Sequence, residues 1–145
     1  MKSMYEDIVK FMKEYVDTYS QYGQIEKTHR MMDKFYAPEL AFPDDGVTSR
    51  DQWYERCLNH PAIQDKLTFD HLVVDEKINQ ISALLKTQAI ERATGKILLE
   101  LRMNVLYKLK INKENNDIKI TEVQVYLETD PVKITKLTQL YQIGK

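Results

Sequence analysis

The sequence has few of the residues that mark the common cofactor-binding and disulfide-stabilised classes. Its 145 residues include one cysteine, Cys57, and four glycines. One thiol cannot form an internal disulfide or a cysteine-based zinc site. The glycines lie too far apart for a dinucleotide-binding or phosphate-binding loop, and no GxSxG string is present. We therefore expect no cofactor, no metal and no serine-hydrolase chemistry.

Long apolar runs and an excess of one charge are also missing. No apolar run exceeds three residues, whereas a spanning helix needs about 20 and a signal peptide about seven or more. Lys and Arg number 21 and Asp and Glu 22, a net charge of −1, which favours neither a nucleic-acid nor a membrane partner. We expect one domain over residues 1–145 in the cytoplasm.

Apolar spacing predicts three helices in the first part of the chain. Residues 4–19 carry one apolar stripe that includes Tyr15 and Tyr19, and Gly23 supplies a stop. A second helix is expected to continue through Tyr36 and to end at Pro38. Its apolar face holds Ile25, His29, Met32, Phe35 and Tyr36. After a Pro-Asp-Asp-Gly turn at 43–46, Ser49 and Gln52 form a capping-box pattern that starts a third helix, with Trp53 and Cys57 facing inward.

The second part of the chain has the alternation of β-strands. We expect strands over 68–74, with Phe69, His71 and Val73 on one face, and over 81–92, with Ile63 and Leu67 in a short turn before them. The run 97–111 is the clearest strand, because all its odd positions are apolar or aromatic. These positions are Ile97, Leu99, Leu101, Met103, Val105, Tyr107, Leu109 and Ile111.

The last strand shows a phase slip that predicts a β-bulge. Ile118 and Ile120 occupy even positions, whereas Val123 and Val125 occupy odd ones, so one extra residue near Thr121 would restore a single apolar face. A final helix is then expected, with Asp130 as its cap and Pro131 at its first position. Its apolar stripe would consist of Ile134, Leu137 and Tyr141.

Helices followed by strands indicate an α+β domain in which helices cover one face of a curved antiparallel sheet. This order resembles the cone-shaped fold of the nuclear transport factor 2-like superfamily, which includes ketosteroid isomerases, scytalone dehydratase and SnoaL-like polyketide cyclases. Residues 23–26 (Gly-Gln-Ile-Glu) look like the string that opens the family's second helix. Residues 35–44 look like the tyrosine-to-aspartate stretch that follows it.

The resemblance implies candidate catalytic residues. Asp44 matches the general base of the isomerase branch, and Tyr15, Tyr19 or Tyr107 would polarise a substrate carbonyl. The late-strand acid of that branch is missing here, and Tyr107 stands near its position. The dehydratase branch uses histidines inside the cone, and His71 and His29 would assist Asp44 if both point inward. His29 and Asp33 share a helical face, but no third ligand lies nearby for a metal.

Aromatic residues are the candidate walls of a small-molecule pocket. Tyrosine and tryptophan add apolar area and keep a polar group for orientation, and plain core packing is the alternative. The ligand-binding candidates are Tyr19, His29, Tyr36, Trp53, Phe69, Met103 and Tyr107. We expect a small apolar or aromatic ligand and, if the protein is an enzyme, cofactor-free isomerisation, dehydration or cyclisation. A non-catalytic interaction module of the same fold is the alternative.

The second face of the longest strand carries Glu100, Arg102 and Asn104 between Leu98 and Leu106. This face is either solvated or the contact of a homodimer, in which mixed charges pair across a two-fold axis. The apolar neighbours favour the dimer, an arrangement that is common in the superfamily that the chain resembles.

Overall fold

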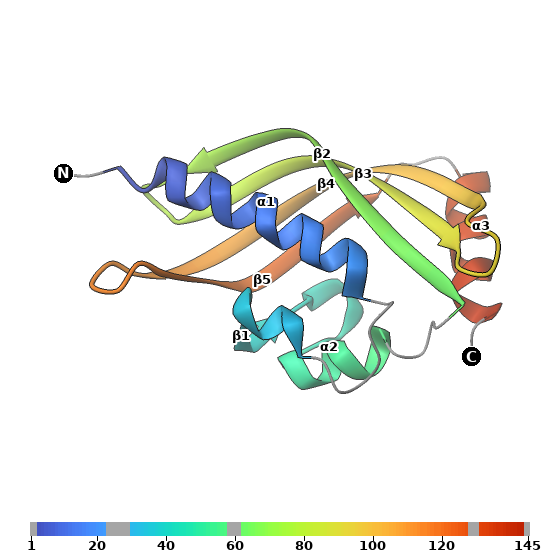
Figure 1. Ribbon diagram of the computed structural model, residues 1–145, viewed down its shortest axis with the longest axis horizontal. Coiled ribbons are helices and arrows are strands. Elements are labelled where there is room, and N and C mark those ends of the chain that lie inside the picture. The colour runs from blue at the N-terminus through green and yellow to red at the C-terminus, as the bar shows by residue number, and fades with distance from the viewer. Residues whose placement is uncertain (1–2, 23–29, 58–61, 128–130, 144–145) are drawn as a thin grey trace.

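The computed structural model describes residues 3–22, 30–57, 62–127 and 131–143 (Figure 1). The first half contains α1 (Tyr5–Tyr22), the 3₁₀ turn η1 (Met31–Lys34), β1 (Tyr36–Ala41), the 3₁₀ turn η2 (Pro43–Asp45) and α2 (Arg50–Cys57). The second half contains β2 (Ile63–Asp75), β3 (Gln80–Glu91), β4 (Ile97–Asn112), β5 (Asp117–Leu127) and α3 (Pro131–Ile143). No helix of this described part is long and apolar enough to cross a membrane.

The strands form one mixed sheet in the order β1-β5-β4-β3-β2. The pairs from β2 to β5 are antiparallel, as expected, but β1 pairs with β5 in parallel, so the prediction of a wholly antiparallel sheet is wrong at this edge. The chain reaches β1 from α1 and not through a hairpin, so β1 is not constrained to run against its neighbour.

Helices α1 and α2 cover one face of the sheet, which we call the inner face, and α3 lies at the opposite end from the N-terminus (Figure 1). Helix α1 runs along β2 in the opposite direction. The backbone amide of Met4 donates to Glu76 at 2.7 Å, and Gln64 Nε2 donates to the carbonyl of Ser20 at 2.6 Å. These contacts fix both ends of α1 on the edge strand.

The main core lies between α1, α2 and the inner face. Its buried sheet residues include Ile81, Ala83, Leu85, Val105, Tyr107, Leu109, Ile120 and Val123. The alternation expected for 97–111 is confirmed as β4, with one exception. Ile97 is 51% exposed because the register between β3 and β4 shifts at Ala89 and Ile90, which moves the first residue of β4 out of phase.

The predicted bulge at Thr121 is confirmed. Lys108 pairs with Glu122 and Leu109 pairs with Ile120, so Thr121 is the extra residue, and its hydroxyl donates to the carbonyl of Lys108 at 3.2 Å. The start of the third helix is also confirmed, since Ser49 Oγ accepts the Gln52 amide at 3.1 Å. Pro131 begins α3, whereas Asp130 and Leu58 lie outside the described residues, as do the side chains of Cys57 and Ile134.

The predicted second helix is wrong beyond residue 34. Only η1 is helical in the described part of this region, and Tyr36 begins a strand that contains Pro38. A proline is compatible with β1 because this strand is at the edge of the sheet and has one free side. Pairing with β5 outweighs the local helical pattern, as the Ile120 amide donates to the carbonyl of Phe35 at 2.7 Å.

The first long strand also differs from the expectation. β2 begins at Ile63, so Ile63 and Leu67 belong to a strand and not to a turn. Phe69 pairs with Leu85, but His71 pairs with Leu84, so Asp70 is an extra residue that reverses the phase of the strand. His71 and Val73 therefore lie on the outer face, and the prediction that they share the face of Phe69 is wrong.

Candidate ligand site on the inner face

Three tyrosines from distant parts of the chain meet inside the core. Tyr15 of α1 and Tyr36 of β1 place their hydroxyl oxygens 2.8 Å apart, and the ring of Tyr107 from β4 lies 5.6 Å from that of Tyr15. All three side chains are at most 2% exposed. Burial, followed by the nearby Tyr15 hydroxyl, raises the pKa of Tyr107 well above its usual range. Tyr107 is therefore a neutral phenol that can only exchange hydrogen bonds.

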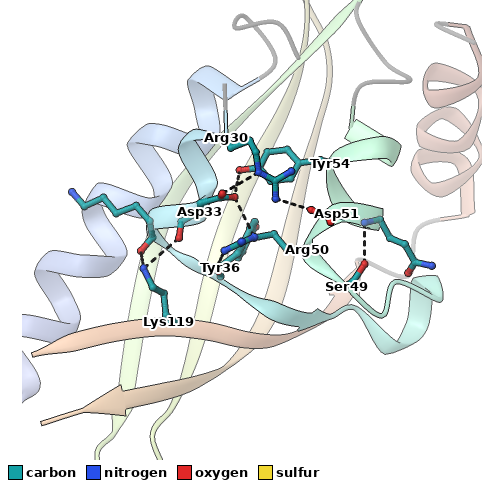
Figure 2. A network of polar contacts seen from close by, with 10 residues as sticks. Arg30, Asp33, Tyr36, Ser49, Arg50, Asp51, Tyr54 and Lys119 are labelled. Carbon is teal, nitrogen blue, oxygen red and sulfur yellow. Dashed lines mark hydrogen bonds and ion pairs between the residues drawn. The ribbon is translucent and has the colours of Figure 1, made fainter. Parts of the chain in front are cut away.

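A polar network holds Tyr36 and α2 in place (Figure 2). Arg50 donates from Nη1 to the carbonyl of Tyr36 at 3.0 Å and pairs through Nε with Asp33 at 3.1 Å. Asp33 also accepts hydrogen bonds from Arg30 Nε at 3.0 Å and from the Tyr54 hydroxyl at 2.9 Å. Since Asp33 is in η1 and Arg50 and Tyr54 are in α2, the network fastens three elements around the tyrosines.

Aromatic rings fill the space between α1, α2 and β1. The ring of Trp53 lies 4.8 Å from that of Tyr36, 5.3 Å from that of Tyr54 and 5.9 Å from that of Tyr19. Trp53 is 4% exposed. At this end of the inner face, the expected wall residues Tyr36, Trp53 and Tyr107 are thus packed against one another as core.

We call Tyr15, Tyr36, Trp53, Tyr54 and Tyr107 the aromatic cluster. Beyond it, the inner face is apolar but less completely covered. Tyr19, Phe69, Met103 and Val125 are only partly buried, and all four pack against the main core. Phe69, Leu85 and Met103 are in register across β2, β3 and β4 and form one row of the sheet. We call Tyr19, Phe69, Met103 and Val125 the inner apolar patch.

At the α3 end of the inner face, an acidic side chain interrupts the apolar surface. The row Asp65, Ala89 and Leu99 lies four residues, about 13 Å, along the strands from the row of Phe69. The hydroxyl of Tyr141 in α3 donates to Asp65 Oδ1 at 2.7 Å. Burial raises the pKa of Asp65, while the hydrogen bond from Tyr141 and the charge of Arg92 oppose that rise.

Sequence reasoning missed Asp65 and Tyr141 as a pair. One signal was present: Ile63, Asp65, Leu67 and Phe69 alternate as a strand would, with an acid at one inward position. The contact itself joins residues 76 positions apart, so local patterns could not reveal it.

A groove of about 310 Å³ lies on the other side of the sheet. Most of its lining residues belong to the outer face, namely Asp70, Leu84, Arg102, Asn104 and Tyr126, and Leu85 and Met103 line it as well. Leu84 and Tyr126 are 50% and 57% exposed, so this outer face combines apolar and charged side chains.

Comparison with known proteins places this architecture. No protein-family model and no curated protein sequence matches the chain. Among solved structures, BvnE pinacolase from Penicillium brevicompactum has a TM-score of 0.68 at 14% identity, covering 100% of this chain and 97% of that one. A SnoaL-like polyketide cyclase from Agrobacterium tumefaciens has a TM-score of 0.61 at 14% identity, covering 95% and 99% of the two chains.

An NTF2-like protein from Cytophaga hutchinsonii has a TM-score of 0.56 at 13% identity, covering 84% of this chain and 90% of that one. This chain has the nuclear transport factor 2-like fold. The cone of this fold corresponds to the inner face with its covering helices, as the sequence predicted.

The nuclear transport factor 2-like fold brings together some of the predicted site residues and separates others. Tyr15, Tyr19, Tyr36, Trp53 and Tyr107 lie in or against the aromatic cluster, and Phe69 and Met103 lie in the inner apolar patch. Asp44 lies in η2 with an exposed side chain, and His71 is exposed on the outer face. The predicted pairing of His71 with Asp44 inside the cone is wrong, because the bulge at Asp70 turns His71 outward. His29 lies outside the described residues.

Proposed function

We propose that this protein binds a small apolar or aromatic molecule on the inner apolar patch, between Trp53 and α3. The observation that carries the proposal is the partial exposure of Phe69, Met103 and Val125 on the inner face of the sheet. An apolar surface that is enclosed by helices but left partly uncovered is typical of a ligand site. The solved structures titled as a polyketide cyclase and a pinacolase support organic substrates for proteins of this shape.

We further propose cofactor-free chemistry beside a carbonyl, such as isomerisation, dehydration or cyclisation. The described residues contain no cluster of three or more metal-ligating side chains. Tyr19, in the inner apolar patch, and the Asp65 carboxyl supply a hydrogen-bond donor and a proton acceptor next to apolar surface, which are the groups that such reactions use. A pocket that binds without turnover would instead favour a non-catalytic interaction module.

Methionine-methyl NMR provides a direct test of binding. The chain has six methionines, and Met103 is the one in the inner apolar patch. Titration with 2-naphthol should shift the Met103 methyl signal by ring current, while the signal of Met32, 0% exposed in the core, should change little. Shifts confined to methionines other than Met103, or no saturable shift, would contradict the proposed site.

Two variants form a matched pair for this titration. Met103→Glu places a carboxylate on the inner apolar patch and should weaken 2-naphthol binding at least tenfold, because burying the ligand would desolvate the charge. Ile78→Glu places the same group in the exposed turn between β2 and β3 and should leave the affinity unchanged. Because the Met103→Glu variant lacks the Met103 methyl group, its binding is measured by the fluorescence of 2-naphthol.

We also propose that two copies pair through their outer faces around Arg102. Exposed Leu84 and Tyr126 supply apolar contact area, and the cross-strand pairs of Lys86 with Glu100 and of Lys108 with Glu122 supply both charge signs. Sedimentation at micromolar concentration should give a dimer, and Tyr126→Glu should give a monomer. A monomeric parent protein would contradict this pairing.

A further inference from the structure

The Asp65 carboxyl is unusual among the acidic side chains of the sheet because it belongs to an apolar row. Its neighbours in register and along the strand are Ile63, Leu67, Ala89 and Leu99, all of which are buried. A carboxyl in such surroundings lowers the stability of the fold unless other groups compensate for its lost hydration. Among the described residues, its compensating hydrogen bond comes from Tyr141 at 2.7 Å.

The geometry leaves one carboxyl oxygen available. Tyr141 donates to Oδ1, and within the described ranges Oδ2 accepts no hydrogen bond. The Asp65 residue is partly exposed. A carboxylate that is held through one oxygen and open at the other has the arrangement of a general base.

A cationic group lies near Ile63, two residues from Asp65 on β2. Arg92, directly after β3, donates from Nη2 to the carbonyl of Ile63 at 3.2 Å, and its buried Nε has no hydrogen-bond partner among the described residues. The positive charge of Arg92 is close enough to Asp65 to lower the pKa of the carboxyl. A buried N–H without a partner is costly, and a ligand oxygen would satisfy it.

We propose that Asp65 is a catalytic general base that removes a proton from a carbon atom of a planar apolar ligand. Tyr141 orients the Asp65 carboxylate through its hydrogen bond, and Arg92 stabilises the negative charge that develops on the ligand oxygen. This inference rests on the proposed function, because the ligand must extend from the inner apolar patch to Asp65. In the step, the C–H electron pair stays on the ligand and moves toward its oxygen, while the proton passes to Asp65 Oδ2. Water removes the proton afterwards.

The base can be tested without knowing the natural substrate by using 5-nitrobenzisoxazole. Removal of its ring proton forms a nitrile, breaks the N–O bond and releases a coloured phenolate. The wild-type protein should accelerate this reaction beyond acetate at equal concentration, and Asp65→Asn should lower the rate about tenfold or more. Asp45→Asn, which removes an exposed carboxyl in η2, should keep the wild-type rate.

Tyr141→Phe separates an orienting role from a merely structural one. The hydrogen bond from Tyr141 lowers the pKa of Asp65, so its removal should shift the pH–rate profile to higher pH while the plateau rate persists at high pH. Tyr5→Phe, at the exposed start of α1, should leave the profile unchanged. A lower rate with an unshifted profile would show that Tyr141 does not act through Asp65.

The outcomes distinguish this inference from the proposed function. Titration with the product, 2-cyano-4-nitrophenol, reports binding through the Met103 methyl signal. If the product binds but the Asp65→Asn variant keeps the wild-type rate, the assignment of the base is overturned and the binding site stands. The same conclusion follows if Asp44→Asn, and not Asp65→Asn, lowers the rate. If the product does not bind, the proposed function fails as well. Far-UV circular dichroism of Asp65→Asn must match the wild type for its lower rate to support the proposal.

Discussion

Removing the carboxylate of Asp33 should destabilise the protein much more than removing that of Asp51. Both acids pair with Arg30, at 3.0 Å and 2.6 Å. Asp33, however, is 33% exposed and also binds Arg50 and the Tyr54 hydroxyl, whereas Asp51 is 77% exposed. Asp33→Ala and Asp51→Ala therefore compare the same charge with and without a partly buried network.

The magnitude follows from the contacts that each variant loses. A hydrogen bond to a charged group contributes about 1.5 to 3 kcal/mol, and Asp33→Ala leaves the Tyr54 hydroxyl, which donates at 2.9 Å, without its acceptor. The two arginine pairs are partly exposed and add up to about 1 kcal/mol each. We expect a loss of about 3 kcal/mol for Asp33→Ala and less than about 1 kcal/mol for Asp51→Ala.

Urea unfolding followed by the fluorescence of Trp53 measures both values. With a slope of about 2 kcal/mol per molar, Asp33→Ala should lower the midpoint by about 1.5 M. A double-mutant cycle with Tyr54→Phe should give a coupling above about 1 kcal/mol for Asp33. Equal losses for the two aspartates, or no coupling, would refute the view that this network fastens η1 to α2.

Three further predictions concern the backbone and the buried acid. Deleting Thr121 should remove the bulge and leave Ile118, Ile120 and Val123 on the inner face, because the pairs Lys108–Glu122 and Leu109–Ile120 then follow each other in a regular ladder; loss of cooperative unfolding would contradict this. Gly46→Ala should cost about 1 kcal/mol in urea unfolding, since φ is 70° and the added carbon meets nothing closer than 3.8 Å; unchanged stability would refute backbone strain as the cause. The raised pKa of Asp65 means that the folded state binds its proton more tightly than the unfolded state does, so this group makes stability fall as pH rises above its unfolded value. Asp65→Asn should therefore gain stability over the wild type as the pH goes from 4 to 8, and a constant difference in unfolding free energy would exclude this linkage.

Local periodicity was sufficient for the elements with one strongly apolar face. The apolar stripe that contains Tyr15 correctly predicted α1, and the alternation that contains Tyr107 correctly predicted β4. The phase slip at Thr121 was visible because the residues on both sides of it are clearly apolar on one face and polar on the other. In β2 both faces are semi-apolar, so the bulge at Asp70 left no such trace and the orientation of His71 was wrong.

The amino-acid sequence by itself determined α1, α2 and the succession of strands from β2 to β5, and hence the fold class, because hydrophobic periodicity is a property of neighbouring residues. Only the tertiary structure decided which polar groups belong to the candidate site. Tyr36 lies in a strand and not in the predicted helix because its backbone pairs with β5. Asp65 is a buried acid because α3 packs over it. Burial and hydrogen bonding between distant segments fix the chemistry of a side chain, and no local pattern records which segments will meet.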